Sequence, residues 1–457
     1  MTTIHASQLL AADGWKSSAR LRIEAGRITS IETDVPPQPG DERHAVIVPA
    51  VPNLHSHAFQ RGMAGFAESR GPGRDDFWSW RETMYRFAAN MSPAQLEAVA
   101  SQAYMEMVES GFSRVGEFHY LHHDLDGRPY SDIGEMAARI AAAARTTGIG
   151  LTLLPVFYAH ASFGGLAPRD NQKRFILDTD GYARLIERCG TLLTDLPEAR
   201  LGVAPHSLRA VTPEELQRVL HIARGIGSDA PVHIHIAEQV AEVRDCIGWS
   251  GRRPVRWLLD HCEVDARWCL VHATHVDEGE LSDIATTGAV VGLCPITEAN
   301  LGDGVFPASR FIAGNGRFGV GSDSNVQISL AAELALLEYS QRLTQQGRNV
   351  IGGPEENMST GRALFQRAHA GGSMALGTAG TALMKSAPAD LVSLAADHPA
   401  LVCRNGDALL DSWIFAGAQG AVDCVWVAGR KLVEKGRHVR RDEILRGYRQ
   451  AMEELCA

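Results

Sequence analysis

The strongest constraint on the fold is a regular alternation of short apolar runs with longer helical patterns through the middle of the chain. The apolar runs are predicted strands, and they cover residues 46–54, 113–120, 149–157, 200–205, 231–237, 268–274, 288–294 and 317–322. Eight strands that alternate with helices are the sequence signature of an α/β protein with a (β/α)8 TIM barrel. In that fold the active site lies where the strands end.

Amphipathic stretches between these runs are predicted helices. They cover residues 93–109, 133–147, 182–193 and 213–224. The clearest start is at Pro213, because Thr212 before it is a candidate N-cap and acidic residues follow in the first turn. Two further helical stretches, 330–339 and 357–369, follow the eighth run, and we expect them to close the barrel.

The two ends of the chain have strand-like patterns instead. Predicted strands cover residues 6–10, 19–24, 27–32, 390–394 and 422–428. Each terminal segment alone is too small to bury a core, so the strands of the two ends need one another. We therefore expect a small composite β-sandwich domain from residues 1–47 with 387–440. A barrel of residues 48–386 and a C-terminal helix of residues 441–457 complete the predicted organisation.

Charge and cysteine content narrow the expected partners and location. The net charge is −10 without a dense basic block, which argues against nucleic acid or an anionic membrane as the main partner. No apolar run reaches the roughly 18 residues that span a bilayer. The eight cysteines include no C-x-x-C pair, and no secretion signal precedes them, so we expect a cytoplasmic protein with free thiols. An anionic ligand would need a local basic pocket.

Residue types that bind divalent metals stand at the ends of four predicted strands. His55 and His57 are two residues apart, and side chains at that spacing point to the same face of a strand. The fifth, sixth and eighth runs end near His235, His272 and Asp323. The predicted ligands are His55, His57, His235 and Asp323. Such a set leaves an open position for water, as in catalytic zinc sites, although iron or manganese also accepts these ligands.

Groups suited to proton transfer accompany the predicted ligands. Glu238 follows His235 by three residues, and His272 closes the sixth run. A bound zinc ion lowers the pKa of water to about 7, so a nearby base produces hydroxide at neutral pH. A carboxylic acid or an imidazole then passes the proton to a departing nitrogen. The predicted catalytic residues are Glu238, His272 and Asp323.

Several of these residue types also have simpler interpretations. His233 is expected to be a hydrogen-bonded core residue, one layer deeper in the barrel than His235, and His275 is expected to lie outside the ligand set. His119, His122 and His123 form a cluster after the second strand that more often belongs to the core than to a site. Asp323, taken alone, is also a candidate helix N-cap.

The strand-end pattern resembles the amidohydrolase superfamily, and in particular its one-metal aminohydrolase branch. That branch carries His-x-His at strand one, His-x-x-Glu at strand five, His at strand six and Asp at strand eight. The positions here are His55, His57, His235, Glu238, His272 and Asp323. The two-metal branch would place a bridging lysine or glutamate at strand three or four, and no lysine stands near 150–160 or 200–209. The resemblance therefore implies one divalent metal ion, Zn²⁺, and it extends to the terminal β domain.

Four segments are similar to the formimidoylglutamate deiminases of bacterial histidine degradation. They are residues 53–65 (NLHSHAFQRGMAG), 78–82 (WSWRE), 202–209 (GVAPHSLR) and 292–302 (GLCPITEANLG). The similarity implies hydrolysis of N-formimino-L-glutamate to N-formyl-L-glutamate and ammonia. It also implies the substrate-binding residues Gln60, Arg81, Tyr120, His206 and Arg209.

The residues themselves are compatible with a small dicarboxylate substrate. Arg81 and Arg209 can each hold a carboxylate through two parallel charge-assisted hydrogen bonds. By sequence alone Arg81 fits a helix-surface ion pair equally well, and the assignment of each arginine to one carboxylate stays open. We also expect the chain to form a homodimer.

Two other functions remain open at this point. A nucleobase or triazine-type deaminase has the same metal site but needs an aromatic or amide-lined pocket instead of two arginines. The two enzyme classes are distinguished by whether Arg81 and Arg209 converge near the metal. A catalytically silent barrel that acts as a scaffold could lack a ligand or the proton shuttle, whereas this chain retains all of them.

Overall fold

The apolar runs of the middle of the chain form the parallel strands of a (β/α)8 barrel, as predicted. The structure is a computed structural model that describes residues 2–70, 73, 75–352, 358–378, 380, 382–417 and 420–457. The barrel strands are β5 (Val51–Ser56), β6 (Phe112–His119), β7 (Gly150–Phe157), β8 (Arg200–Leu201), β9 (Ala204–Pro205), β10 (Val232–Ile236), β11 (Trp268–His272), β12 (Val290–Leu293) and β13 (Arg317–Val320). Parallel bridges from Val203 to Val232 and from Ser56 to Asp323 join the two halves into a closed ring.

Two predicted strands are each divided in the structure. The first predicted run contains the end of β4 (Glu42–Pro49) and most of β5, with Ala50 between them. The hydrogen-bond partners change there. The backbone amide of Ala50 donates to the carbonyl of Asp390, beside the sheet that the two ends of the chain form, whereas the backbone amide of Val51 donates to the carbonyl of Gly111, beside the barrel strand β6. The fourth run is divided into β8 and β9 around Gly202, where a Cβ atom would lie 2.6 Å from the Pro231 carbonyl oxygen.

The four helices predicted between the barrel strands, α2 to α5, begin and end close to their predicted positions. The helices of the described residues are α1 (Phe77–Ala89), α2 (Pro93–Glu109), α3 (Glu135–Thr147), α4 (Thr179–Leu193), α5 (Pro213–Ile226), α6 (Val240–Ser250), α7 (Pro254–His261), α8 (Glu278–Thr287), α9 (Pro295–Leu301), α10 (Ala308–Ala313), α11 (Leu330–Gln345), α12 (Thr360–Ala375), α13 (Asp407–Phe415) and α14 (Arg441–Cys456). Two 3-10 helices, η1 (Ala58–Met63) and η2 (Asp170–Gln172), follow β5 and β7. Thr212 caps α5 as predicted, since its hydroxyl accepts from the Glu215 amide at 3.2 Å.

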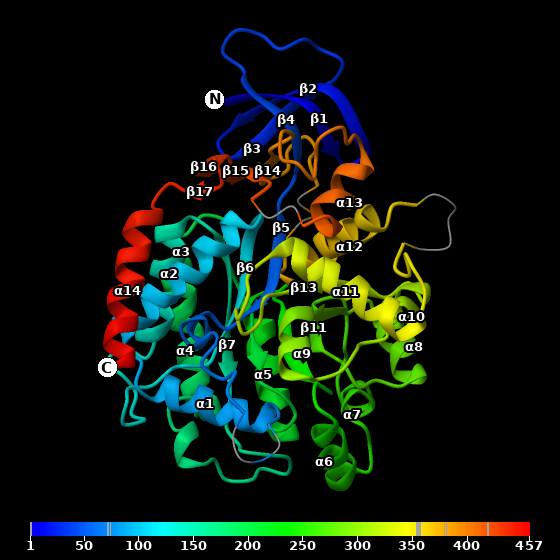
Figure 1. The fold of residues 1–457 in the computed structure, drawn as a ribbon. Coiled ribbons are helices and arrows are strands. Elements are labelled where there is room, and N and C mark those ends of the chain that lie inside the picture. The colour runs from blue at the N-terminus through cyan, green and yellow to red at the C-terminus, as the bar shows by residue number, and fades with distance from the viewer. Residues whose placement is uncertain are drawn as a thin grey trace.

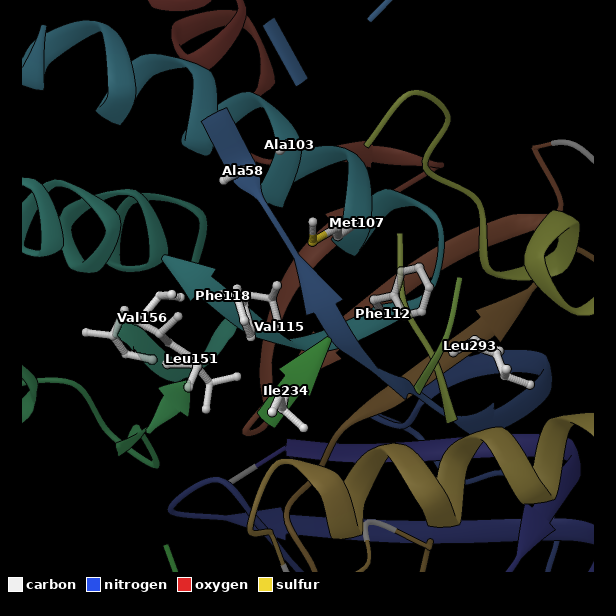
Figure 2. Close-up of a cluster of buried hydrophobic side chains, with 14 of the residues drawn as sticks. Ala58, Ala103, Met107, Phe112, Val115, Phe118, Leu151, Val156, Ile234 and Leu293 are labelled. Carbon is white, nitrogen blue, oxygen red and sulfur yellow. The ribbon is translucent and has the colours of Figure 1, made fainter. Parts of the chain in front are cut away.

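A large buried cluster connects the barrel strands to the surrounding helices. Figure 2 shows Phe118 of β6, Val156 of β7 and Ile234 of β10 within this cluster, together with Met107 of α2. All four side chains are fully buried. Burial of a side chain of this size stabilises the fold by about 1.5–3 kcal/mol. This packing fixes the strands, and with them the polar residues at their ends.

Helix α12 closes the N-terminal end of the barrel, as expected. A Cβ atom at Gly371 would lie 1.9 Å from the Phe318 carbonyl oxygen, so only glycine permits this approach of helix to strand. His233 donates from Nε2 to the Ala375 carbonyl at 2.7 Å, inside the barrel, and this confirms its interpretation as a core residue. The predicted start of this helix, Asn357, lies outside the described residues, whereas α11 extends past Tyr339 to Gln345.

Strands from both ends of the chain form one eight-stranded sheet above the barrel (Figure 1). Its order is β17-β16-β15-β14-β4-β1-β2-β3, with β1 (Thr2–Ala11), β2 (Gly14–Glu24), β3 (Arg27–Glu32), β14 (Leu391–Leu394), β15 (Val422–Val427), β16 (Arg430–Glu434) and β17 (Arg437–His438). Strand β4 lies at the junction, parallel to β1 and antiparallel to β14. We refer to these strands as the terminal sheet. Helix α14 packs on α2 along one side of the barrel (Figure 1).

None of the helices in the described part of the chain is long and apolar enough to cross a membrane.

Candidate active site

Three imidazoles and one carboxylate converge at the C-terminal ends of the barrel strands. His55 lies in β5, His57 follows it, His235 lies in β10, and Asp323 follows β13. The Nε2 atoms of His55 and His235 are 3.1 Å apart, and Oδ1 of Asp323 lies 3.2 Å from Nε2 of His57 and 3.5 Å from that of His55. All four side chains are buried. The structure thus brings together all four predicted metal ligands.

The hydrogen bonds around these imidazoles leave their Nε2 lone pairs directed at one point. His57 donates from Nδ1 to the Phe118 carbonyl at 2.9 Å, and His235 donates from Nδ1 to the His206 carbonyl at 3.1 Å. A neutral imidazole that donates from Nδ1 carries its lone pair on Nε2. Burial lowers the pKa of His55 to about 3, so it is neutral as well. Neutral imidazoles and an ionised carboxylate that face each other in this way fit a divalent cation.

The backbone beside the ligands adopts an unusual conformation. Ala237, His272, Asp323 and Asn325 have φ angles of 51°, 67°, 46° and 56°, in the left-handed region. Each such residue costs about 1–3 kcal/mol and persists only where surrounding contacts fix it. Here the side-chain amide of Asn325 donates from Nδ2 to the backbone carbonyls of His57 and Asp323 at 3.1 and 3.0 Å.

Asp323 reaches the site from a loop and not from a strand. Our prediction extended the eighth strand to residue 322, directly before Asp323, but β13 ends at Val320. Two backbone hydrogen bonds hold the loop against β5, from the Asp323 amide to the His55 carbonyl at 3.0 Å and from the His57 amide to the Asp323 carbonyl at 2.9 Å. The N-cap of the next helix is Ser329, so Asp323 is not a helix N-cap.

His272 and Glu238 lie beside the four converging groups. Nε2 of His272 is 3.7 Å from Oδ2 of Asp323 and 3.9 Å from Oε1 of Glu238. On its other side, Nδ1 of His272 is 3.2 Å from Oε1 of Glu298, a residue to which the sequence analysis gave no role. Glu298 also accepts from the Cys294 amide at 2.9 Å, so it orients the imidazole ring.

Electrostatic interactions separate the protonation states of these three groups. Burial raises the pKa of Glu238 to about 7, although His272 and Arg209 oppose this shift. Burial alone would lower the pKa of His272, but the carboxylates of Glu238, Glu298 and Asp323 outweigh it and raise the pKa to about 10. Burial likewise opposes ionisation of Asp323, yet His55 and the neighbouring imidazoles hold its pKa well below the usual range. The site therefore contains an acid, a base and a group that titrates near neutral pH.

A cavity opens directly onto these groups. All five predicted substrate-binding residues line it: Gln60, Arg81, Tyr120, His206 and Arg209. Gln60 comes from η1 and donates from Nε2 to the Tyr120 hydroxyl at 2.7 Å, while its Oε1 has no partner among the described residues. The ring of Tyr120 lies against that of His57 at a centroid distance of 5.0 Å.

The two arginines bring positive charge into this cavity. The Nε atoms of Arg81 and Arg209 are buried, and neither has a hydrogen-bond partner among the described residues. Arg81 stacks over the Trp78 ring at 4.3 Å and forms no ion pair within the described part of the chain, so its interpretation as a helix-surface ion pair is wrong. Arg209 lies 3.8 Å from Glu238 and 3.9 Å from Glu242, longer than a hydrogen bond in each case.

The remaining histidines lie outside the convergent group. His122 and His123 are held by the carbonyls of Val156 and Ile176, and Nε2 of His275 is 2.8 Å from the Asp303 carbonyl. His119 is buried beside His122 and does not line the cavity. Two tyrosines of the cavity wall, Tyr85 and Tyr158, carried no signal in the sequence, because a phenol in an apolar run looks like a core residue.

Comparisons with known proteins agree with this geometry. Residues 46–432 match the model of the amidohydrolase family, and residues 1–45 match the N-terminal domain of formimidoylglutamate deiminase HutF. The formimidoylglutamate deiminase of Pseudomonas aeruginosa is 48% identical over 456 residues, which cover 100% of both chains. The crystal structure of an amidohydrolase from Brucella melitensis is 57% identical, with a TM-score of 0.96 and full coverage of both chains.

A more distant structure shares the fold. An adenosine deaminase from Xanthomonas campestris, solved with bound zinc, has a TM-score of 0.81 at 19% identity, over 100% of this chain and 98% of its own. The family match spans most of the sequence and includes every residue of the convergent site. The chain belongs to the amidohydrolase family.

Proposed function

We propose that this chain hydrolyses N-formimino-L-glutamate to N-formyl-L-glutamate and ammonia, a step of histidine degradation. The observation that carries the proposal is the pair of guanidinium groups, Arg81 and Arg209, in the cavity beside the convergent site, because the buried Nε atom of each has no hydrogen-bond partner among the described residues. Two cations match the two carboxylates of the substrate, in a protein whose net charge is −10. The full-length similarity to the Pseudomonas aeruginosa deiminase supports the same substrate.

We propose that one Zn²⁺ ion is held by His55, His57, His235 and Asp323. The convergence of their free lone pairs supports this set, as does the zinc in the structure of the Xanthomonas campestris protein. When bound, the ion supplies a Lewis acid that lowers the pKa of a water molecule to about 7. The absence of a lysine near the ends of strands three and four supports a single ion.

The roles of the chain's own groups follow from their protonation. Asp323 is ionised despite its burial, and it accepts a proton from the attacking water. His272 is protonated, and it donates a hydrogen bond that holds the water oxygen. The oxygen attacks the formimino carbon. Glu238, with its pKa near 7, delivers a proton to the imino nitrogen and leaves a tetrahedral intermediate with an amino group. The amino group then takes the proton held by Asp323 and leaves as ammonia, while the hydroxyl of the intermediate returns its proton to Glu238 and becomes the formyl carbonyl. Glu298 keeps the His272 ring in the orientation this step requires.

The polar wall of the cavity would orient the substrate. The free Oε1 of Gln60 is an acceptor for the amidine N–H, while Tyr120 fixes the amide of Gln60. Arg81 and Arg209 would hold the carboxylates, with His206 between the arginines and the ligands. A neutral nucleobase or triazine ring carries no negative charge for the two guanidinium groups to neutralise, so the cavity favours the dicarboxylate. A scaffold would not need the proton-transfer groups that this chain retains.

An ammonia-release assay on purified protein of known metal content tests the proposed substrate. N-formimino-L-glutamate is compared with N-formimino-L-aspartate, guanine and cytosine at equal concentrations. We expect the highest kcat/KM for N-formimino-L-glutamate and no measurable release from either nucleobase. Deamination of guanine or cytosine at a comparable kcat/KM would contradict the proposal and favour the nucleobase deaminase.

We also propose the domain organisation of the sequence analysis, with residues 1–47 and 387–440 as a composite β-sandwich domain, residues 48–386 as the barrel and residues 441–457 as a C-terminal helix. The hydrogen bonds that tie β4 to both β1 and β14 support this division. A homodimer and a cytoplasmic location stay predictions. Sedimentation velocity at micromolar concentration tests the dimer, which predicts a mass of twice 49.4 kDa.

A further inference from the structure

Two tyrosines share the cavity with Arg81 and Arg209 but have no role in the mechanism above. Tyr85 comes from α1 and Tyr158 follows β7, and both line the cavity although their side chains are almost fully buried. We propose that the Tyr158–Tyr85 pair donates a hydrogen bond to a carboxylate of the substrate, and that Gln172 is the positioning residue that keeps it a donor. This inference rests on the proposed dicarboxylate substrate.

Gln172 determines the hydrogen-bonding role of both phenols. Its Oε1 accepts from the Arg169 amide at 2.8 Å, which fixes the orientation of the side-chain amide. Its Nε2 then donates to the Tyr158 oxygen at 2.7 Å and to the Tyr85 oxygen at 3.4 Å. Gln172 is itself 1% exposed, so these bonds have no competition from water. Because the phenol oxygens act as acceptors toward Gln172, their O–H protons stay available for another acceptor.

The pair holds one more proton than the protein can accept. Both phenol oxygens lie within hydrogen-bond distance of one atom, Nε2 of Gln172, so the two hydroxyls are neighbours and one of them can turn its proton toward the other. The second O–H then has no acceptor among the described residues, since the structure gives neither hydroxyl a bond to a carbonyl or carboxylate. Burial raises the pKa of Tyr158 far above its ordinary value, and Tyr85 adds to the shift, so the hydroxyl keeps its proton. A buried donor without an acceptor is costly unless a ligand supplies one.

The surroundings of Tyr158 indicate an anion as that acceptor. Its ring packs edge-on against His206 at 4.6 Å and near Phe175 at 6.1 Å, so the phenol cannot turn away from the cavity without losing these contacts. Arg81 and Arg209 line the same wall and already carry the positive charge that two carboxylates need. A neutral phenol adds direction without a third charge, and hydrogen bonds to charged acceptors are stronger than neutral ones. The pair would therefore orient a carboxylate that an arginine attracts.

The variant Tyr158→Phe tests the proposed hydrogen bond. We expect KM for N-formimino-L-glutamate to rise roughly 10- to 100-fold, with kcat changed by less than about threefold, because the bond forms in the ground state and persists in the transition state. The matched control is Tyr182→Phe. Tyr182 is also fully buried, but its hydroxyl donates to the Pro155 carbonyl at 2.8 Å, outside the cavity, so KM should stay unchanged.

Truncated substrates identify the group that the phenol contacts. N-formimino-L-glutamine lacks the side-chain carboxylate, and 4-formimidoylaminobutyrate lacks the α-carboxylate. On the analogue that lacks the contacted carboxylate, the ratio of kcat/KM between wild type and Tyr158→Phe should fall to about one, while the other analogue keeps the full ratio. An equal loss on both analogues, or unchanged KM on the full substrate, would overturn the inference.

Variants of Gln172 test its positioning role. Gln172→Glu places an acceptor against the phenol oxygens, so the O–H turns from the substrate and KM should rise about as much as in Tyr158→Phe. Gln172→Met removes the amide without offering an acceptor, so a smaller rise is expected. The double variant Tyr158→Phe/Gln172→Glu should lose no more than either single variant. Additive losses would show that Gln172 acts independently of the phenols.

Equilibrium binding separates this inference from the proposed function. Calorimetry with glutarate, a dicarboxylate without a reacting group, should show binding that weakens at least about tenfold in Tyr158→Phe but not in Tyr182→Phe. If wild type binds glutarate in this way yet releases no ammonia from N-formimino-L-glutamate, the proposed function fails and the carboxylate contact stands. If wild type is active and Tyr158→Phe matches it in both KM and glutarate affinity, the contact fails and the function stands.

Discussion

Among the described residues, metal-binding residue types cluster at the barrel ends and in the terminal sheet, and the hydrogen bonds of these two regions differ. In the barrel, the Nε2 atoms of His55 and His235 lie 3.1 Å apart beside the carboxylate of Asp323. In the terminal sheet, Glu42, His44 and Cys424 also come close together. There, however, His44 places Nε2 2.9 Å from Glu42 and Nδ1 3.7 Å from Asp423, and Lys431 pairs with Glu42.

The difference shows that proximity of ligand types does not by itself make a metal site. In the barrel, His57 and His235 donate their Nδ1–H groups to backbone carbonyls and keep the lone pairs of Nε2 free, whereas the charged groups of the sheet cluster pair with one another. A cation entering the sheet cluster would have to displace the ammonium group of Lys431. We therefore expect metal only in the barrel, and the following predictions test that contrast.

The largest effect is expected from removal of a barrel ligand. His235→Ala should lose the bound metal, and ammonia release should fall to background, because the three remaining ligands no longer complete the site. The matched variant in the other cluster is His44→Ala, which should retain both metal and activity. Metal analysis of the purified proteins and the ammonia assay measure the two outcomes. Loss of metal from His44→Ala would break the contrast.

Glu238→Gln should separate catalysis from metal binding. Glu238 lies near the ligands but contributes no lone pair to them, so metal content should match wild type while kcat falls about 10²- to 10⁴-fold. A pKa of about 7 means that wild type loses the protonated donor as pH rises through neutrality, and kcat should decline there. The variant should lack this limb of its pH profile. Near-normal turnover in Glu238→Gln would remove the residue from the mechanism.

Arg209→Met should weaken substrate capture more than turnover. The guanidinium has an unpaired buried Nε and reaches its acidic neighbours only at 3.8–3.9 Å, so its main hydrogen-bond partner is expected to be the substrate. We expect kcat/KM to fall roughly 10- to 100-fold. Arg218→Met, at an exposed pair with Asp180, is the control and should leave kcat/KM unchanged. An unchanged kcat/KM in Arg209→Met would exclude it from the site.

The smallest effect is expected for stability in the terminal sheet. His44→Gln removes one member of a partly exposed charged cluster, and such pairs contribute about 1 kcal/mol or less. The free energy of unfolding from urea titration should change by no more than that, with activity intact. A loss of several kcal/mol would mean that the cluster is a structural element of the sheet.

The sequence predicted the barrel and the convergent ligands because both depend on local patterns. His55 and His57 share a strand-end position, and the period of the apolar runs places His235 and His272 at neighbouring strand ends. Asp323 joins the group as predicted, but it does not stand at the end of a strand. It lies in a loop, and backbone hydrogen bonds to His55 and His57 hold it in place.

Other features depend on contacts that no local pattern records. Glu298 orients His272 across 26 residues of sequence, and Gln172 reaches Tyr85 across 87 residues. The division of the first run at Ala50 follows from a change of hydrogen-bond partner between two sheets, which the uninterrupted apolar run from residue 46 concealed. Arg81 lines the cavity because α1 lies over the end of the barrel, and the sequence of α1 alone does not reveal that position.

The most direct test of the central claim is a metal titration of the apoprotein, prepared by chelation, with ammonia release from N-formimino-L-glutamate as the readout. If the barrel site alone holds one essential ion, activity rises linearly with added Zn²⁺ and stops rising at one equivalent per chain, in wild type and in His44→Ala alike. A break at two equivalents, or turnover that does not depend on added metal, would contradict the account.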